Sequence, residues 1–205
     1  MYSKYDITTA KWGEVKEMGH YDMAILPWGA TEPHNLHLPY CTDMLTAQAV
    51  AFEVAEKAAM QGVNLMVLPG IPLGSQNPGQ IELPYCIHTS QTTQMAILRD
   101  VVRSLKRQGI RKLMIMSGHG GNNFKGIIRD IMIEDPEMII VHNEWFAIIP
   151  RTDYFEEKED DHAGELETSV MLHYYPDLVR LDLAGDGQFS KFGIEGLNTK
   201  VAWLP

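Results

Sequence analysis

Cysteine is scarce in this sequence. Only Cys41 and Cys86 occur among 205 residues, and they form no Cys-x-x-Cys pair. A disulfide framework or a zinc site built from thiolates needs more cysteines at closer spacing. We therefore expect neither, and we interpret Cys41 as a small buried apolar side chain rather than a nucleophile.

Long apolar runs are also missing. A membrane-spanning helix needs about 18 or more consecutive apolar residues, and no stretch of the sequence approaches that length. The first residues, Met1 to Met18, contain no apolar core of the kind found in a signal peptide. These absences predict a cytoplasmic protein with no membrane partner.

Positive charge is in short supply. The chain carries 17 Lys+Arg against 27 Asp+Glu, for a formal net charge of -10. Nucleic-acid binding requires a cationic surface that displaces counterions from phosphates, yet the densest charge run, residues 156–161, is mostly acidic. We expect no nucleic-acid partner and interpret this run as a solvated loop.

Three common catalytic or nucleotide-binding motifs are absent. The Gly118-His119-Gly120 turn has no serine at its centre, so it is not the nucleophile elbow of a serine hydrolase. Neither a phosphate-binding loop ending in Gly-Lys-[Ser/Thr] nor a Gly-x-Gly-x-x-Gly fingerprint occurs. Nucleotide-dependent functions therefore lose their main support.

The residues that are present form a folded α/β pattern. Of the 205 residues 45% are hydrophobic, which suffices for a continuous core, and no linker or repeat divides the chain. We expect a single domain over residues 1–205. Short, continuous apolar runs alternate with stretches of helical periodicity, which predicts a three-layer α/β/α fold with a mostly parallel sheet.

The predicted elements follow from these runs and their boundaries. The expected strands are Met23–Trp28, Asn64–Pro69, Lys112–Met116 and Met138–His142. The expected helices are Met44–Met60, a helix capped by Thr89 or Ser90 that ends at Gln108, Asn123–Glu134, and an apolar helical stretch through Leu172.

Ionisable side chains gather directly after the first predicted strand. Glu32 and His34 lie two residues apart, so in an extended segment they point to the same side. His37 follows, and Asp43 comes nine positions after His34. Histidine with carboxylate suits Zn, Mn or Fe rather than a calcium cage. The alternative is a polar loop in which Asp43 simply caps the next helix.

Two later segments add to this set. His119 follows the third predicted strand between glycines that allow a ligand to approach the backbone closely, which makes Gly120 a candidate substrate contact. His162 is followed by Glu165 and Glu167. Either glutamate could merely stabilise a helix N-terminus; alternatively His162 is a general acid or base and one glutamate, preferably Glu167, completes a metal site.

Together these segments resemble the creatininase (creatinine amidohydrolase) family. The resemblance rests on Gly-x-x-Glu-x-His-x-x-His-Leu-Pro with a later Asp, on Gly-His-Gly-Gly-Asn, and on His-Ala-Gly-x-x-Glu-Thr-Ser. They stand here as Gly29–Pro39 with Asp43, Gly118–Asn122 and His162–Ser169, within a span of roughly Met23 to Pro176.

The resemblance implies a two-metal hydrolase with an α/β/α fold that assembles as a homo-oligomer, commonly a hexamer. By that analogy Glu32 and His119 hold one divalent ion, His34 holds the other and Asp43 bridges the two. His162 then serves in proton transfer near a small-molecule substrate. The expected cofactors are two Zn or Mn ions, with Fe also possible.

This chain departs from the family pattern at one ligand. Creatininase itself has a glutamate ligand two residues after the turn histidine, where this chain has Gly121. We expect Glu167 to supply the missing carboxylate and creatinine not to be the substrate. The loop Gly74–Gly79 also differs, which indicates a ligand of different shape. His37 is expected to orient a metal ligand.

The sequence thus predicts a metal-dependent hydrolase of a C–N bond in a cyclic amide or formamide. Asn77 and Trp145 are further candidate substrate contacts. One alternative is a hydrolase of the same fold that opens a keto-sugar or inositol-derived ring or an ester-like bond. The other is a non-catalytic metabolite-binding module, a hypothesis that Gly121 favours.

Overall fold

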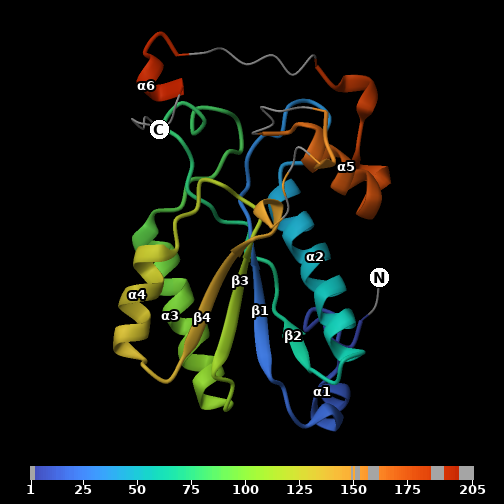
Figure 1. Ribbon diagram of the computed structural model, residues 1–205, viewed down its shortest axis with the longest axis vertical. Helices are drawn as coiled ribbons and strands as arrows, with labels where there is room; N and C mark the ends of the chain where they lie inside the picture. Colours follow the sequence, from blue (N-terminus) through green and yellow to red (C-terminus); the bar gives the residue numbers. More distant parts are fainter. Residues whose placement is uncertain (1–2, 149, 151–152, 157–161, 186–191, 199–205) are drawn as a thin grey trace.

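The computed structural model describes residues 3–148, 150, 153–156, 162–185 and 192–198. Most of the acidic run, residues 157–161, therefore lies outside the described residues. The described chain folds into a parallel sheet with helices on both faces (Figure 1). Among the helices of these residues, none combines the length and apolar character needed to cross a bilayer.

The sheet has four strands in the order β2-β1-β3-β4. Their bounds are β1 Met23–Trp28, β2 Leu65–Val67, β3 Lys112–Ser117 and β4 Ile139–Glu144. Every neighbouring pair is parallel, as the continuous apolar runs predict. The chain runs from β1 outward to β2 at one edge, returns to β3 at the centre and then runs outward to β4 at the other edge. The direction in which strands are added therefore reverses between β1 and β3.

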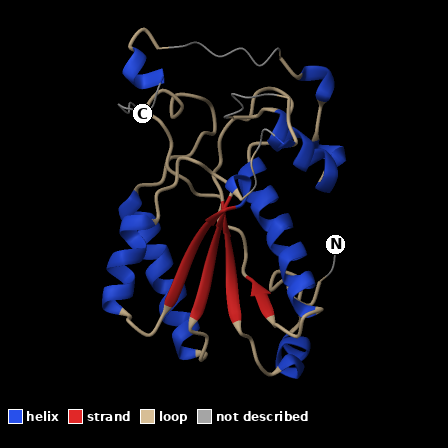
Figure 2. Ribbon diagram, in the orientation of Figure 1, coloured by secondary structure: helices blue, strands red, loops and turns tan. Residues whose placement is uncertain are grey.

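Helices cover the two faces of the sheet and complete the three predicted layers (Figure 2). Helix α2, Thr42–Ala59, lies on one face, whereas α3, Gln91–Arg107, and α4, Lys125–Glu134, lie on the other. Helix α3 starts where the Ser90 side chain accepts a hydrogen bond from the Thr93 N–H. It ends just before Gly109, whose φ of 83° suits glycine.

Small side chains bring α2 close to the sheet. Ala47, Ala51 and Ala55 are completely buried and pack in one cluster with Ile25 of β1 and Val67 of β2. Their four-residue spacing forms a single ridge along the helix. On the opposite face, the core is built from larger side chains of α3 and α4, among them Leu98, Val102 and Ile131.

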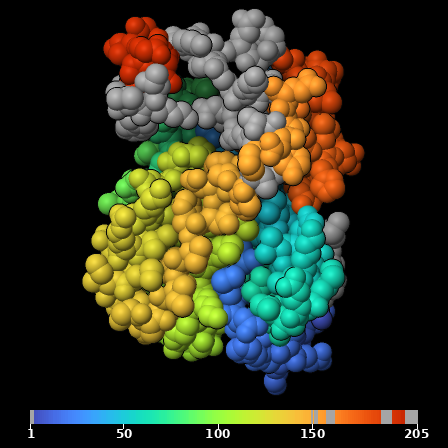
Figure 3. All heavy atoms as spheres, in the orientation of Figure 1, coloured from blue at the N-terminus to red at the C-terminus, as the bar shows by residue number. Residues whose placement is uncertain are grey.

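Several short elements were not predicted. Helix α1, Trp12–Met18, and α6, Glu195–Asn198, are too short to leave a clear periodicity, as are the 3-10 turns η1, η3 and η4, Trp145–Ala147, Pro176–Leu178 and Leu181–Leu183. Helix α5, Glu165–Tyr174, corresponds to the predicted apolar stretch. It lies directly above α2, as the orange and cyan atoms of Figure 3 show.

The strands end level at the carboxyl edge of the sheet. Trp28 of β1 pairs with Ser117 of β3, which pairs in turn with Glu144 of β4. The loops that follow these strands therefore start side by side, at the point where the strand order reverses. In open α/β sheets this is the position where ligands bind.

Two glycines let the start of α2 enter this edge. A Cβ on Gly29 would lie 2.2 Å from the Met44 nitrogen, and a Cβ on Gly118 would lie 2.1 Å from the Asp43 carbonyl oxygen. Since Gly29 follows β1 and Gly118 follows β3, the first turn of α2 packs directly on the ends of both central strands. This packing places Asp43 between the two loops.

Candidate metal centre

Six ionisable side chains converge above the carboxyl edge of the sheet. They come from the loop after β1, the first turn of α2, the turn after β3 and the start of α5, and they are Glu32, His34, Asp43, His119, His162 and Glu167. Subsets of these residues bring three ligand atoms within 4.8 Å of one another. Four segments far apart in the sequence thus build one cluster.

Asp43 lies at the centre of this cluster. Its side chain is 2% exposed. Oδ1 lies 2.8 Å from His34 Nε2, and Oδ2 lies 3.1 Å from His119 Nδ1. Because each oxygen faces a different histidine, this single carboxylate has the geometry to bridge two ions.

A backbone hydrogen bond fixes the ring of His119. Its Nε2–H donates to the Ser75 carbonyl oxygen at 2.8 Å. The other ring nitrogen, Nδ1, lies 3.0 Å from Glu32 Oε1 and 3.1 Å from Asp43 Oδ2. The ring therefore directs Nδ1 at two carboxylates, as a metal-ligating histidine does when its other nitrogen is held by a carbonyl.

His34 is held in the same manner. It is fully buried, and its Nδ1–H donates to the Glu32 carbonyl oxygen at 3.1 Å. Its Nε2 faces Asp43 and lies 3.9 Å from Glu167 Oε2. His34, Asp43 and Glu167 make up one group of possible ligands, and Glu32, Asp43 and His119 make up another.

The structure distinguishes the two glutamates of α5. Glu167 accepts a hydrogen bond from the Ala163 N–H at 2.6 Å and points toward His34. Glu165 instead accepts from the Glu156 N–H at 2.9 Å. Glu167, and not Glu165, is therefore the glutamate that lies beside His34 and Asp43 as a possible ligand.

His162 approaches the cluster from its exposed side. Its Nε2–H donates to the Pro33 carbonyl oxygen at 2.8 Å, and Nδ1 lies 3.9 Å from Glu32 Oε1. Its ring lies 4.4 Å from that of His34, centroid to centroid. The side chain is 37% exposed, the most accessible of the six. Nδ1 is thus left to face both the cluster and the solvent.

Buried charges shift the proton affinities of the cluster. Burial lowers the pKa of His34 and of His119, but the neighbouring carboxylates outweigh it and raise these pKa values to about 9 and about 10. Burial acts to raise the pKa of Asp43, yet the two histidines hold it below its ordinary value. For Glu167, burial raises the pKa. Without a metal ion, two protonated histidines balance the buried carboxylates.

The donor atoms fit divalent cations. Among the described residues, the buried oxygens Glu32 Oε1 and Asp43 Oδ2 have no hydrogen-bond donor unless His119 is protonated at Nδ1. In a neutral His119 ring with Nε2–H as donor, the Nδ1 lone pair would face these same two oxygens. In the metal-free protein a proton on Nδ1 lies between these three atoms; a divalent cation can take its place, since nitrogen with carboxylate oxygen is a donor set for Zn, Mn or Fe.

Metal binding is expected to displace the histidine protons. Zn²⁺ should bind the metal-free protein more tightly as the pH rises from about 6 to about 9, because ligand histidines must be deprotonated. In the metal-free protein, the pairing of protonated His34 and His119 with the carboxylates contributes fully to folding stability below pH 6.5. This contribution is lost as the pH rises through the pKa values of the two histidines, about 9 and about 10. Calorimetric titration in buffers of different protonation enthalpy measures the released protons; pH-independent binding with no release would contradict this assignment.

Gly121 has no room for a larger residue. Its Cβ would lie 2.5 Å from His119 Nε2 and 2.6 Å from the Ser75 carbonyl oxygen. A glutamate at this position would push apart the hydrogen bond that orients His119. The turn after β3 therefore has no room for a carboxylate, whereas Glu167 of α5 lies 3.9 Å from His34 Nε2.

The candidate substrate contacts are placed less centrally. Gly120 is exposed in the turn after β3, and Asn77 is exposed on the loop after β2, where its N–H donates to Gln80 Oε1 at 3.4 Å. Trp145 is partly buried against the core cluster beneath α2, with its indole nitrogen buried and unpaired. These three residues stay predictions.

Two other side chains differ from expectation. His37 Nε2 lies 2.9 Å from Thr168 Oγ1, so this ring contacts α5 rather than a candidate ligand. Gln80 was not singled out from the sequence, yet its Nε2 donates to Glu32 Oε2 at 3.4 Å. The sequence shows that this loop is polar, but it does not indicate that Gln80, rather than Asn77, contacts Glu32.

Replacing Gly118 with alanine is expected to disrupt the candidate metal centre by displacing the first turn of α2. The new Cβ would collide with the Asp43 backbone, so α2 must shift, at a cost of about 1 to 3 kcal/mol in unfolding free energy and with loss of bound metal. Gly120→Ala is the matched control, since no atom lies within 4 Å of its Cβ. Chemical denaturation and metal analysis check this; equal results for both variants would contradict it.

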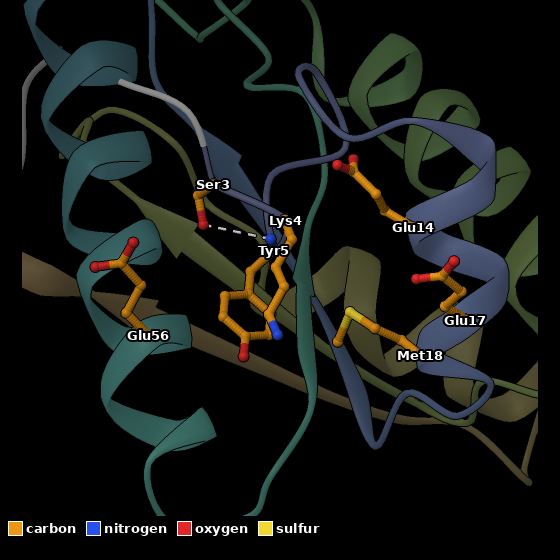
Figure 4. Close-up of a pocket in the computed structure, with 7 residues that line it drawn as sticks. All are labelled: Ser3, Lys4, Tyr5, Glu14, Glu17, Met18 and Glu56. Atoms are coloured by element: carbon orange, nitrogen blue, oxygen red, sulfur yellow. Dashed lines mark hydrogen bonds between the residues drawn. The ribbon is translucent and has the colours of Figure 1, made fainter.

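A separate hollow lies near the N-terminus. It is an open hollow between the N-terminal segment, α1 and α2, and Figure 4 shows its lining: Ser3, Lys4, Tyr5, Glu14, Glu17, Met18 and Glu56. None of the six cluster residues lines it. It belongs to the opposite end of α2 from Asp43.

Comparison with known proteins finds relatives over most of the chain. The model of the creatininase family, described as creatinine amidohydrolase, matches residues 8–204. The creatinine amidohydrolase of Pseudomonas putida is 30% identical over 181 residues, which are 79% of this chain and 68% of that protein. A mycofactocin precursor peptide peptidase from Mycolicibacterium smegmatis is 30% identical, over 78% of this chain and 61% of its own length. A 3-dehydro-scyllo-inosose hydrolase from Thermotoga maritima is 26% identical, over 89% and 62%.

Solved structures share the whole fold. A candidate creatinine amidohydrolase from Bacteroides fragilis is 56% identical, with a TM-score of 0.97 over 100% of this chain and 81% of that one. A mutant creatininase of Zn-Zn type is 27% identical, with a TM-score of 0.77 over 94% of this chain and 82% of that one, and a further creatininase structure is named for Mn. The chain belongs to the creatininase family of hydrolases.

Proposed function

We propose that this protein is a dinuclear metal-dependent hydrolase that cleaves the C–N bond of a cyclic amide or formamide. The observation that carries this proposal is the Asp43 carboxylate, which is shared between a group with Glu32 and His119 and a group with His34 and Glu167. The donor set suits Zn, Mn or both, and Fe also fits.

In this proposal the two groups divide the ligands. Glu32 and His119 hold one ion, His34 and Glu167 hold the other, and Asp43 bridges them. When bound, such a pair of ions polarises a carbonyl oxygen and lowers the pKa of a shared water toward neutrality. The carbonyl oxygens of Ser75 and Glu32 hold the two histidine rings in place, so that His119 Nδ1 and His34 Nε2 would be the ligand atoms.

His162 is the proposed proton carrier. Its Nε2–H is committed to the Pro33 carbonyl oxygen, so Nδ1 is the atom available to take up or deliver a proton. In hydrolysis, a water oxygen bonds to the carbonyl carbon, the C–N bond breaks, and the leaving nitrogen gains a proton. His162 Nδ1 would take a proton from the water and deliver it to that nitrogen.

The substrate is proposed to be a small polar molecule that enters from the exposed side of His162. The loop after β2 supplies the amide of Gln80, which donates to Glu32 Oε2, and the exposed Asn77, whose N–H donates to Gln80 Oε1. Gly120 and Trp145, both expected from the sequence as substrate contacts, would add exposed backbone and an apolar surface. Together these groups suit a planar ring with hydrogen-bonding edges.

A substrate panel tests the proposal. Purified protein, stripped of metal and reloaded with Zn²⁺ or Mn²⁺, would be assayed against lactams, cyclic ureides, formamides and lactones. We expect metal-dependent release of the amine from a C–N substrate. A protein that binds neither ion, or that hydrolyses none of the panel in either metal form, would overturn the proposal.

One alternative within the same fold is hydrolysis of a keto-sugar or inositol-derived ring or of an ester-like bond. Gln80 and the loop around it favour a hydroxylated ligand, and one relative is named as an inosose hydrolase. Parallel assays of cyclic amides and cyclic polyhydroxy ketones decide between the two. A third hypothesis, which the absence of a carboxylate at Gly121 favours, is a non-catalytic binding module. The approach of Glu167 to His34 Nε2, at 3.9 Å, supports an enzyme instead.

The proposed working form is a cytoplasmic homo-hexamer in which residues 1–205 form one domain. Large apolar side chains are exposed on loops beside the centre, including Leu36 at 75% and Tyr85 at 83%, which supports a covering partner surface. Light scattering after size-exclusion chromatography tests this; a monomer at micromolar concentration would contradict it.

A further inference from the structure

The side chain of Asn122 joins the loops that follow three strands. It is 4% exposed, in the turn after β3. Its Oδ1 accepts a hydrogen bond from the Ser75 N–H at 3.1 Å, and its Nδ2 donates to the Gly29 carbonyl oxygen at 3.2 Å. Gly29 follows β1 and Ser75 follows β2, so one amide ties all three loops together.

A second amide completes this network. Gln94 of α3 is fully buried, and its Nε2 lies 3.0 Å from Ser75 Oγ, 3.2 Å from Asn122 Oδ1 and 3.2 Å from the Thr89 carbonyl oxygen. The Ser75 backbone N–H and its hydroxyl are thus both held from inside the protein. A serine held at both groups has little freedom to rotate its carbonyl.

That carbonyl is the one that orients His119. Its oxygen accepts the His119 Nε2–H at 2.8 Å, which leaves Nδ1 directed at Glu32 and Asp43. If the Ser75 carbonyl turned away, the ring could rotate, and Nδ1 would lose its alignment. The buried network therefore reaches the metal centre through a single hydrogen bond.

We propose that Asn122 and Gln94 are positioning residues of the metal centre, which fix His119 through the Ser75 carbonyl. The effect on metal affinity rests on the proposed function; the effect on the ring of His119 does not. Neither side chain belongs to the six-residue cluster. Partners that orient a ligating histidine typically contribute about 10- to 100-fold to metal affinity.

Two variants and a matched control test this inference. Asn122→Ala removes all three hydrogen bonds of the amide, to Ser75, Gly29 and Gln94. Gln94→Met keeps the side-chain length but removes the donor. Gln91→Met makes the same change at an exposed position of the same helix. We expect Zn²⁺ affinity, measured by chelator competition, to fall about 10- to 100-fold in Asn122→Ala. Gln94→Met should lose less, because Asn122 still holds Ser75, and Gln91→Met should match the wild type.

The ring nitrogens of His119 give a readout that loss of stability alone would not move. In ¹⁵N-labelled wild type, the His119 Nε2–H should exchange slowly with solvent, both with Zn²⁺ and without metal. In Asn122→Ala this protection should be lost while the fold, judged from amide spectra, is kept. Should Asn122→Ala not fold, Gln94→Met carries the same comparison.

The outcomes separate the two proposals. If wild type binds no metal but shows the protected Nε2–H that Asn122→Ala loses, the metal proposal fails and the positioning role stands. If folded variants keep both wild-type Zn²⁺ affinity and a protected Nε2–H, the positioning role is wrong.

Discussion

Replacing Asp43 with asparagine is expected to empty both metal positions and to lower turnover by about 1000-fold or more. Each oxygen of this carboxylate faces a different histidine, at 2.8 and 3.1 Å, so no other single change removes a ligand from both groups. Metal ions contribute several kcal/mol of transition-state stabilisation, and about 4 kcal/mol corresponds to this fall in rate. The amide keeps the volume of the carboxylate, which limits packing effects.

The measurement is elemental analysis of the purified variant, followed by turnover in excess metal. Asp100→Asn is the matched control, because this aspartate is 81% exposed on α3. It should keep full metal content and activity. An Asp43→Asn protein that retains both ions would show that the carboxylate is not the bridge.

His162→Ala is expected to separate chemistry from metal binding. Its Nε2–H is held by Pro33, and its Nδ1 lies 3.9 Å from the nearest carboxylate oxygen of Glu32, so it can transfer a proton without being required as a ligand. Loss of a general acid or base typically lowers kcat by about 100- to 10,000-fold. We expect that loss with unchanged metal content.

His20→Ala serves as the control, since this histidine is 77% exposed and lies before β1. It should leave both kcat and metal content unchanged. Loss of metal in His162→Ala would place this ring among the ligands, next to Glu32 and His34, which form a third possible group with it. If the wild type and His162→Ala both bind a small-molecule ligand and neither has activity, the hypothesis of a non-catalytic binding module is favoured.

The framework of the fold could be predicted because its signals are local. The bounds of β1 match the prediction, and β3 extends it by one residue, since apolar runs flanked by polar residues mark strands buried on both faces. Helix α2 begins at Thr42, two residues before the predicted Met44. Thr42 and Asp43 are polar and buried at the centre, so hydrophobic periodicity cannot include them.

The residues of the candidate centre could be predicted from the sequence, but the contacts between them could not. Glu32, His34 and His119 follow strands, where an α/β sheet binds ligands. Glu165 and Glu167 lie two residues apart, on different sides of α5, and the sequence does not say which side meets the loop after β1. The roles of Gln80, Asn122 and Gln94 depend on contacts between distant loops, which single-sequence patterns do not encode.

The crowding around Gly121 also limits how such a centre can evolve by single substitutions. A Cβ there meets His119 Nε2 at 2.5 Å and the Ser75 oxygen at 2.6 Å, so a glutamate acquired at this position would damage one ligand while adding another. A lineage with this backbone cannot gain a carboxylate in the turn after β3 by one substitution, because the loop that holds Ser75 must move first.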